Sequence, residues 1–405
     1  MNQPFVNDKD NVRIAWLLPS MERGNYWQPV LKEFTKSFKQ TTVYTGLWEG
    51  FIPGFEGAFP VEVVGNTRFI KTRSGSGYDP GFSYVSPKIV NHLLKFKPDV
   101  IFISGFSLWT LLVMLFKPWG KWRVVIVYDG SSPTIDFRNS RPRLIFRSTM
   151  VRFTDALITN SGEAKTYLTK ILGAEERCVF ARPYQVPDVK TLLGHQEETS
   201  ESEPGLQRPV FLFVGKVLPR KGLKFLLEAC AILKPQGYQR YTLLIVGDGE
   251  QREELEVYSQ NNGLTDCVQW AGWGNYDRLG AYFRRADVFV FPTLEDIWGV
   301  VLLEAMAFGK AILCSKWAGS SELVVEGENG YIFDPYNPKE LAEMMRRFID
   351  TPELTVSMGH KSQQLIAQHN PEAAAKFLVE VTSFALSKDT VGESTTGQTP
   401  SMPNQ

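Results

Sequence analysis

Short apolar runs rich in valine and isoleucine alternate with longer amphipathic stretches through the first half of the chain. The runs predict strands of a parallel sheet, since both faces of such a sheet are covered and its strands read as near-continuous hydrophobic segments. Amphipathic stretches near 28–38 and 141–153 predict helices, as does one that opens with Ser86 as N-cap and Pro87 as first helical residue. This alternation predicts a doubly wound α/β sheet. The expected strands are Val12–Leu18, Pro60–Val64, Val100–Ser104, Val124–Tyr128 and Ala156–Thr159.

The same alternation restarts after residues 195–208, a polar, acidic stretch without periodicity that we interpret as a linker. The chain is therefore divided into an N-terminal lobe (1–194) and a C-terminal lobe (209–370). A helix over 371–387 is expected to pack back toward the N-terminal lobe, and the tail 388–405, poor in apolar residues, is expected to be disordered. Further strands are expected at Val210–Val214, Thr242–Val246, Val268–Trp270, Val288–Phe291, Ala311–Cys314 and Gly330–Phe333, and further helices at Leu223–Leu233, Gln251–Asn261, Pro338–Ile349 and Pro371–Leu386.

One uncharged segment, Val100–Phe116, is 17 residues long and lies at the lower limit for a membrane-spanning helix. It begins with the β-rich run VIFIS and breaks at Gly105, and a second β-rich run, RVVIVY, follows it. We therefore favour strand, helix and strand, with a membrane span as the alternative.

Charge and composition narrow the class of protein. The chain has 44 basic and 44 acidic residues, which argues against a nucleic-acid binder with a global basic field, and its 43% hydrophobic content excludes general disorder. Residues 1–200 hold 25 of the basic and 18 of the acidic side chains, so the first half is basic and the second acidic. Basic and aromatic residues mix in 117–123 and in a set of arginines, which predicts either contact with an anionic membrane or a solvated surface. The arginines are Arg138, Arg141, Arg143, Arg147 and Arg152.

Cysteines and histidines give no sign of a metal site or a disulfide framework. The four cysteines lie far apart without a CxxC pair, and the four histidines lack metal-ligand spacing. The N-terminus has no basic segment followed by a long apolar stretch, so we see no signal peptide. We expect a cytoplasmic protein, either free or peripheral on the inner face of a membrane, with no bound metal and no cofactor.

The stretch 291–315, FPTLEDIWGVVLLEAMAFGKAILCS, carries the first candidate chemistry. A strand runs into a polar loop, and a helix begins near Gly299, where unpaired N–H groups and the helix dipole favour an anion. Asp296 precedes this helix and Glu304 lies within its apolar sequence. The alternative on spacing alone is that Asp296 is an ordinary N-cap and Glu304 a solvated residue.

A second stretch, VGKVLPRKG (214–222), brings Lys216, Arg220 and Lys221 into one loop at the end of a strand. Such cations can stabilise a diphosphate leaving group; the alternative is a solvated basic turn. A third stretch, GDGEQR (247–252), lacks the last glycine of a dinucleotide-binding fingerprint and reads as a strand-end turn.

Three stretches in order resemble the retaining, nucleotide-sugar-dependent glycosyltransferases of family four, the "glycosyl transferases group 1" type with the GT-B fold. They are VGKVLPRKGLKFLLEA, LLIVGDGEQREEL, and the long block ADVFVFPTLEDIWGVVLLEAMAFGKAILCSKWAGSSELVVEGENGYIFDP. The resemblance is strong over 209–335 and weaker over the N-terminal lobe. It implies two Rossmann-like doubly wound parallel-sheet lobes that face a central cleft.

The resemblance also implies roles for individual residues. Lys221 matches the lysine that contacts the donor diphosphate, and Lys216 stands where the family often has arginine. Asp296 and Glu304 match the two acids of an E-x7-E block, the first near the transferred sugar and the second on the ribose of the nucleotide. Together with Lys216 and Lys221 they form the predicted catalytic set. The backbone of Gly299 and Val300 would meet the phosphates, and the base would lie near Gly272 and Trp273. Glu295 precedes the first acid, but the spacing favours Asp296.

The N-terminal lobe departs more from the family pattern. The first loop, SMERGN, has one glycine, Gly24, where the family loop is glycine-rich, and RPYQVPD (182–188) stands for Pro-Asn-Gly-Val-Asp. Tyr128-Asp129-Gly130 replaces a frequent family histidine. Gly24 and Asp129 are therefore candidates on the acceptor side.

These expectations amount to a metal-independent hexosyltransferase-type enzyme that moves a sugar from a UDP-, GDP- or ADP-sugar to an acceptor hydroxyl with retention, in polysaccharide or glycolipid synthesis. The acceptor would be a glycan, a lipid-linked intermediate or a small molecule, and no nucleic acid is expected. A sugar-nucleotide epimerase, a phosphorylase and a non-catalytic sugar-nucleotide binding protein are the alternatives.

Overall fold

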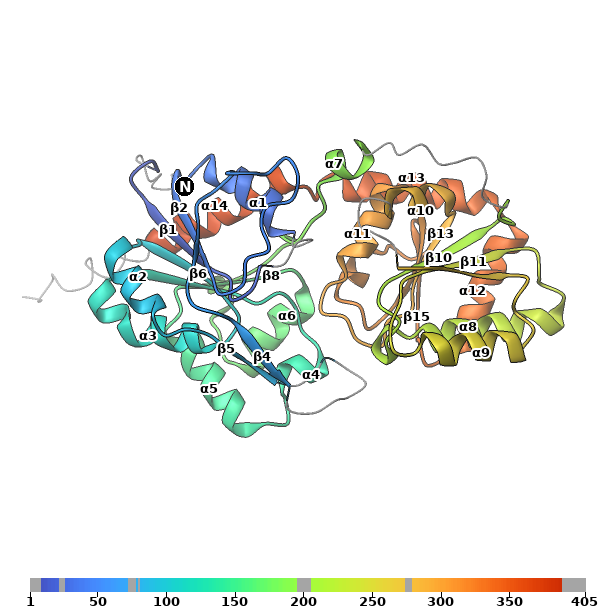
Figure 1. The fold of residues 1–405 in the computed structure, drawn as a ribbon, viewed down its shortest axis with the longest axis horizontal. Coiled ribbons are helices and arrows are strands. Elements are labelled where there is room, and N and C mark those ends of the chain that lie inside the picture. The colour runs from blue at the N-terminus through green and yellow to red at the C-terminus, as the bar shows by residue number, and fades with distance from the viewer. Residues whose placement is uncertain are drawn as a thin grey trace, which may run out of the picture.

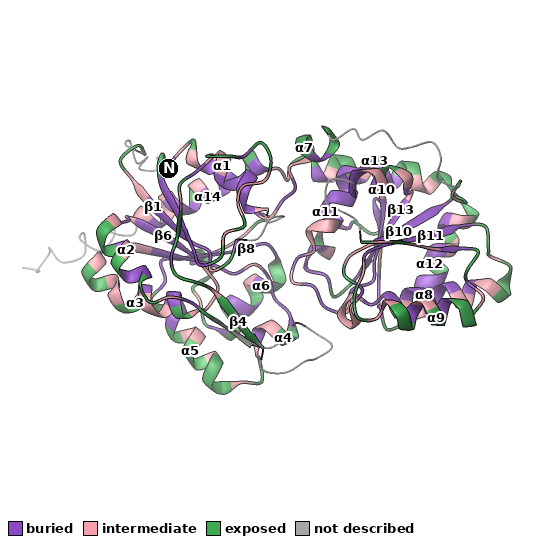
Figure 2. Cartoon of the chain, viewed as in Figure 1, coloured by how far each residue is buried: buried purple, intermediate pink, exposed green. Residues whose placement is uncertain are grey.

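The computed structural model describes residues 9–21, 26–71, 78, 81–194, 205–273 and 279–387. Two all-parallel sheets, each covered on both faces by helices, form two α/β lobes (Figure 1). Buried residues follow both sheets and the inner faces of their helices (Figure 2). The predicted fold class is confirmed in both lobes.

The N-terminal sheet has the strand order β3-β2-β1-β6-β7-β8-β9, and every neighbouring pair is parallel. The central strands are almost wholly buried, which accounts for their continuous runs of valine and isoleucine. An antiparallel hairpin of β4 and β5 lies outside this sheet. The strands are β1 (Arg13–Leu17), β2 (Gln40–Thr45), β3 (Val61–Val63), β4 (Arg68–Lys71), β5 (Gly81–Tyr84), β6 (Val100–Ser104), β7 (Arg123–Val127), β8 (Ala156–Thr159) and β9 (Val179–Ala181).

Helices of the N-terminal lobe follow its strands as crossover connections. The longest, α3, begins with a capping box, in which the Ser107 hydroxyl accepts from the Thr110 N–H and the Thr110 hydroxyl accepts from the Ser107 N–H. The helices are α1 (Trp27–Thr35), α2 (Ile89–Phe96), α3 (Leu108–Gly120), α4 (Pro133–Asp136), α5 (Arg141–Arg152), α6 (Gly162–Thr166) and α7 (Val189–Gly194).

The C-terminal sheet repeats the pattern with the order β12-β11-β10-β13-β14-β15, again all parallel. Its strands are β10 (Val210–Val214), β11 (Thr242–Val246), β12 (Val268–Gly272), β13 (Val288–Phe291), β14 (Ala311–Ser315) and β15 (Gly330–Phe333). Its helices are α8 (Leu223–Leu233), α9 (Arg252–Asn261), α10 (Leu279–Arg285), α11 (Val300–Ala307), α12 (Pro338–Asp350) and α13 (Glu353–Ile366).

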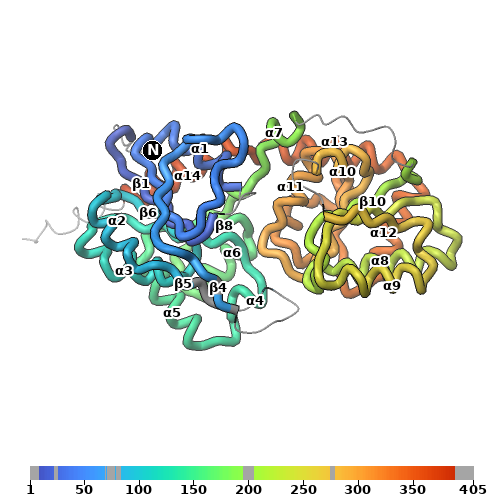
Figure 3. Tube along the Cα trace, viewed as in Figure 1, coloured from blue at the N-terminus to red at the C-terminus, as the bar shows by residue number. Residues whose placement is uncertain are grey.

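The last helix, α14 (Pro371–Ser387), crosses from the C-terminal lobe to the N-terminal lobe and lies beside α1 (Figure 3). Its apolar face is buried: Phe377, Leu378 and Val381 belong to the same core cluster as Trp16 and Phe34. The two ends of the described chain therefore pack together, which ties the lobes to one another.

The order of strands defines where a ligand is expected. In an open parallel sheet, ligands bind at the carboxyl ends of the strands where the strand order reverses. That point lies between β1 and β6 in the first lobe and between β10 and β13 in the second. The loops that follow these four strands are therefore the places to look for a site.

Several predictions about local structure were wrong or incomplete. The helix predicted to open at Ser86 begins at Ile89, and the Ser86 hydroxyl instead accepts from the Lys88 N–H (3.4 Å) in the preceding turn. Strands β2, β4, β5 and β9 and the helices α4, α6, α7 and α13 were not predicted. The segment Val100–Phe116 forms β6 and most of α3, and among the described residues no helix is long and apolar enough to cross a bilayer.

Candidate functional site

The loops after β10 and β13 meet at the switch point of the C-terminal lobe. Gly222, which has φ +68°, lies directly against the second loop, so that a Cβ there would be 2.0 Å from the Pro292 carbonyl oxygen. This close approach brings Lys221 to Asp296, with Nζ 2.5 Å from Oδ2. Both side chains are largely buried, at 14% and 8% exposure. The sequence placed these residues 75 positions apart, and the fold makes them a pair.

Asp296 is surrounded by donors from three segments. Besides Lys221, the Arg220 guanidinium lies 3.7 Å from its Oδ2, and Oδ1 accepts from the Trp298 N–H (3.3 Å) and the Tyr78 hydroxyl (3.5 Å). Burial, and next the Asp296 charge, raise the pKa of Tyr78. Gly299, not Asp296, is the N-cap residue of α11, so the reading of Asp296 as an ordinary N-cap is wrong.

Gly299 begins α11 in a conformation that other residues rarely adopt, with φ +86°. A Cβ at this position would lie 2.5 Å from Cε1 of Phe291 and 3.2 Å from the Ser320 hydroxyl. The same Phe291 ring lies under the Lys221 ammonium, 5.4 Å from its centre. Lys221 and the start of α11 therefore both contact the Phe291 ring. A cation beside a helix N-terminus is an arrangement that can bind an anion.

Glu304 lies one helical turn into α11 and is 1% exposed, although nearly all its neighbours in the helix are apolar. The reading of Glu304 as a solvated residue is therefore wrong. Its Oε1 accepts from the Tyr26 hydroxyl of the N-terminal lobe (2.9 Å), which is a partner that a buried carboxylate needs. Sequence reasoning gave no role to Tyr26.

The other predicted donor-side residues lie near the same edge of the sheet but form fewer contacts. Lys216 follows β10 and is exposed, and its ammonium makes no hydrogen bond or ion pair within the described part of the chain. Gly272 is the last residue of β12. Its carbonyl accepts a hydrogen bond from the Gly247 N–H (2.7 Å), and it donates no hydrogen bond to Asp296 or Glu304. Trp273 is 63% exposed. Val300 is the first residue of α11.

A cavity of about 800 Å³ lies at the switch point of the N-terminal lobe, between the ends of β1, β6 and β7. Asp129 lines it, with Oδ1 accepting from the Tyr184 hydroxyl (2.9 Å). Burial raises the pKa of Asp129 to about 6, although hydrogen bonds from Tyr184 and Gln185 oppose the shift. Arg143 and Arg147 of α5 line the same cavity. The other acceptor-side candidate, Gly24, lies outside the described residues.

Hydrogen bonds join the lobes around the donor-side loop. Glu295 is 7% exposed, and its Oε1 accepts from both the N–H (3.0 Å) and the hydroxyl of Thr134 in α4. The Trp298 indole donates to the Gln185 carbonyl (2.9 Å), and Glu322 accepts from the Gly162 N–H at the start of α6 (2.7 Å). The residue set aside at the sequence level, Glu295, is thus a contact between the lobes, whereas Asp296 faces the cations.

The described residues contain no group of three or more histidine, cysteine, aspartate or glutamate side chains that could hold a metal ion. All four cysteines are buried and unpaired.

Two facing α/β lobes, each with its switch point open to the other, define the GT-B class of fold. The family comparison agrees with it: residues 195–365 match the family described as "Glycosyl transferases group 1". This range contains Lys216, Lys221, Asp296 and Glu304, so the predicted resemblance to group 1 glycosyltransferases is confirmed for the part of the chain that carries the donor-side residues.

Individual relatives are glycosyltransferases. An α-D-kanosaminyltransferase of Streptomyces kanamyceticus is 29% identical over 168 residues, which cover 42% of this chain and 43% of that protein. A D-inositol 3-phosphate glycosyltransferase of Corynebacterium jeikeium is 25% identical over 298 residues, 71% of this chain and 69% of the relative. The chain thus spans less than half of the first relative's length.

Among solved structures, HepE of Anabaena in complex with UDP is 19% identical, with a TM-score of 0.69, and the match covers 92% of this chain and all of that one. A structure of the same protein with UDP-glucose is 20% identical, with a TM-score of 0.66 and coverage of 92% and 100%. At this identity the likeness concerns the fold, and it confirms GT-B for both lobes.

Proposed function

We propose that this protein is a retaining glycosyltransferase that moves a sugar from a nucleotide-sugar to an acceptor hydroxyl. The observation that carries the proposal is the meeting of Lys221 and the start of α11 on the Phe291 ring, beside the buried acid Asp296. A diphosphate that leaves a sugar carries developing negative charge, and fixed cations with a helix N-terminus stabilise such charge. The match of residues 195–365 to the group 1 glycosyltransferases supports a glycosyltransferase activity.

The donor would occupy the carboxyl edge of the C-terminal sheet. Lys221, Lys216 and the N–H groups of Gly299 and Val300 would bind the diphosphate, and Glu304 would accept from the ribose hydroxyls. Gly272 and Trp273 would lie near the base. Lys221 is paired with Asp296 here, so a bound diphosphate would compete for the ammonium and leave the Asp296 carboxylate to orient sugar hydroxyls.

The reaction needs leaving-group stabilisation more than a strong base. The bond between the anomeric carbon and the diphosphate oxygen breaks with its electron pair going to the diphosphate, which gives an oxocarbenium-like transition state. The acceptor oxygen bonds to the same face of that carbon, and its proton passes to the departing diphosphate. Retention follows from attack on the face that the leaving group vacates. Cationic side chains supply the stabilisation in this proposal, without a metal ion.

The acceptor would bind in the N-terminal cavity, with its hydroxyl near Asp129, and we propose a role in polysaccharide or glycolipid synthesis. We also propose that the enzyme works in the cytoplasm at the inner face of a membrane, which it contacts through the basic and aromatic surface of α3 and α5. The exposed side chains of Trp119 (73%) and Ile145 (68%) support that contact.

A panel of UDP-, GDP- and ADP-sugars tests the proposal. The native state should melt at a higher temperature with the correct donor, because a ligand that binds only the folded state stabilises it. Incubation with that donor and candidate acceptors should then release nucleoside diphosphate and give a product with the donor's anomeric configuration. An epimerised donor, a requirement for inorganic phosphate, or binding without turnover would each contradict the proposal in favour of an epimerase, a phosphorylase or a binding protein.

A further inference from the structure

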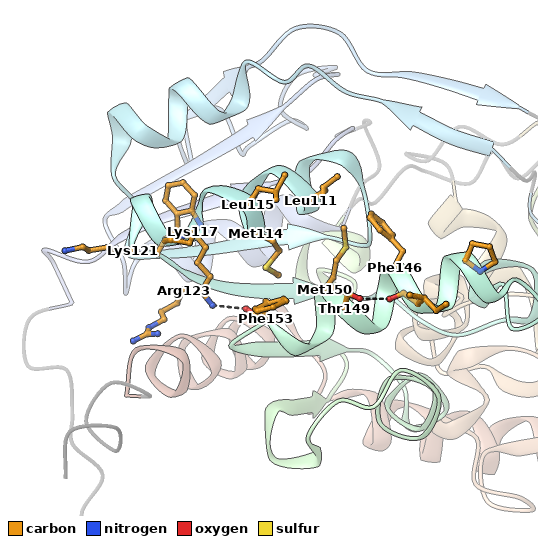
Figure 4. A pocket seen from close by; sticks show the side chains of 14 residues that line it. Leu111, Met114, Leu115, Lys117, Lys121, Arg123, Phe146, Thr149, Met150 and Phe153 are labelled. Atoms are coloured by element: carbon orange, nitrogen blue, oxygen red, sulfur yellow. Dashed lines mark hydrogen bonds between the residues drawn. The ribbon is translucent and has the colours of Figure 1, made fainter. Parts of the chain in front are cut away.

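A second cavity, of about 980 Å³, lies in the N-terminal lobe between α3 and α5. Figure 4 shows Leu111, Met114 and Leu115 of α3 on one side, facing Phe146 and Met150 of α5 on the other. The volume lies at the upper end of the range of about 300–1,000 Å³ that is typical of ligand sites. We call this cavity the α3–α5 groove.

Apolar side chains at the rim of the groove are exposed to solvent. Leu115 is 55%, Ile145 68% and Phe153 62% exposed. A cluster of exposed apolar residues around a hollow is uncommon on a protein without a partner for that surface.

The α3–α5 groove adjoins the cavity that contains Asp129, because Leu111 and Phe146 line both. At this junction the surroundings change from apolar to cationic. Arg143 stacks on the Phe137 ring, 3.7 Å from its centre, and Arg147 donates to the Asp136 carbonyl (3.1 Å) and the Tyr167 hydroxyl (2.9 Å). Neither guanidinium pairs with a carboxylate within the described residues, so both retain unneutralised charge next to the cavity.

The charged residues of α3 and α5 indicate what kind of ligand would bind in the groove. Neither α3 nor α5 contains an aspartate or glutamate, whereas α5 alone carries four arginines. At the far end of the groove Lys117 and Arg123 share the single carboxylate of Asp155, and Lys121 also lines the groove there, whereas Arg143 and Arg147 lie at the end next to the Asp129 cavity. An apolar channel that ends in arginines fits one molecule with a hydrocarbon chain and a phosphate, since guanidinium forks bind phosphate well.

From this arrangement we infer that the acceptor is a membrane lipid with a phosphate-containing headgroup. Its hydrocarbon chain lies in the α3–α5 groove, its phosphate lies between Arg143 and Arg147, and its hydroxyl reaches the Asp129 cavity. This inference rests on the proposed function, because it names the acceptor class for that same reaction. It also explains the proposed membrane contact, because the hydrocarbon chain of the lipid would pass directly from the bilayer into the groove.

Binding of dodecyl phosphate to the full chain, below its critical micelle concentration, tests the inference by calorimetry. The inference predicts that it binds at least roughly tenfold more tightly than hexyl phosphate, since each buried methylene adds to the affinity. Inorganic phosphate and the neutral dodecyl maltoside should each bind more weakly than dodecyl phosphate. Equal affinity for hexyl and dodecyl phosphate would overturn the inference with no variant needed.

Matched variants locate the two halves of the site. Leu115→Ser with Ile145→Ser should weaken dodecyl phosphate roughly tenfold or more, whereas Val257→Ser with Val356→Ser, exposed on α9 and α13, should not. All four side chains are solvent-exposed, so unchanged melting temperatures are expected.

Arg143→Gln should weaken dodecyl phosphate but leave dodecyl maltoside unchanged. Its control is Arg152→Gln, an exposed arginine of the same helix that does not line either cavity. If a variant and its control lost equal affinity for dodecyl phosphate, the binding would reflect general attraction to the protein surface rather than this site, and the inference would be overturned. These assays contain no sugar nucleotide, so a negative result in them would overturn the inference about the acceptor without bearing on the proposed glycosyltransferase activity. Donor binding and donor consumption test that activity separately.

Discussion

Replacement of Gly299 by alanine tests the geometry that joins α11 to Phe291. Two costs are expected. The residue has φ +86°, a conformation that costs an L-residue roughly 1–2 kcal/mol. The added methyl would also lie 2.5 Å and 2.8 Å from two carbons of the Phe291 ring, and overpacking of this kind costs roughly 1–3 kcal/mol. Together the substitution should lower the free energy of unfolding by roughly 2–5 kcal/mol.

Gly237 provides a control that separates the two costs. It has the same φ, +86°, and lies in the same lobe, but a Cβ there would have nothing within 4 Å. Gly237→Ala should therefore show only the conformational cost of roughly 1–2 kcal/mol.

Urea unfolding of both variants, followed by circular dichroism, gives the comparison, with donor binding as a second readout. The Phe291 ring also lies under Lys221, so Gly299→Ala should lose donor affinity while Gly237→Ala keeps it. Equal destabilisation of the two variants would refute the packing argument. Undiminished donor binding by Gly299→Ala would refute the role of this helix start.

Three further outcomes are expected. Because the folded-state pKa of Asp129 is raised to about 6 from 3.8, the folded state binds the extra proton, so the stability that this group contributes is present below pH 4 and is lost as pH rises toward 6. The loss is at most about 3 kcal/mol, and Asp129→Asn should flatten it in urea titrations at several pH values. Glu304→Gln should raise the donor Kd roughly tenfold or more by removing a charged acceptor from the ribose, with the exposed Glu254→Gln as control; equal Kd values would contradict that role. Turnover should persist in excess EDTA, and its loss with recovery on adding Mg²⁺ would contradict a reaction driven by side-chain cations.

The sequence predicted the architecture well because hydrophobic runs report burial directly. The four strands at the two switch points, β1, β6, β10 and β13, were predicted within one or two residues, since strands that are buried on both faces contain almost only apolar residues. The strand β2 was missed because four of the six residues in its sequence, QTTVYT, are polar. The start of α2 was missed because Ser86-Pro87 resembles a helix start but forms the turn before it.

The candidate site was predicted in part, for a different reason. Lys221, Asp296 and Glu304 all belong to motifs that lie within single loops or helices, so the family resemblance of those local stretches identified them. Tyr26 and Tyr78 were not identified, because they reach Glu304 and Asp296 from the other lobe, more than 200 positions away. Contacts of that kind depend on how two lobes pack, which no local pattern records. The adjacency of the two N-terminal cavities depends on packing in the same way.

The most direct test of the central claim is the turnover of Lys221→Ala measured beside Lys224→Ala. Lys224 is an exposed lysine of α8, one turn further along the same segment, and has no ion pair among the described residues. Loss of one preorganised charge contact to the leaving group predicts a fall in kcat of roughly 100-fold or more for Lys221→Ala. Lys224→Ala should keep the rate of the unmodified enzyme. Equal rates for the two variants, at saturating donor, would contradict the claim that the cation at position 221 stabilises a departing diphosphate.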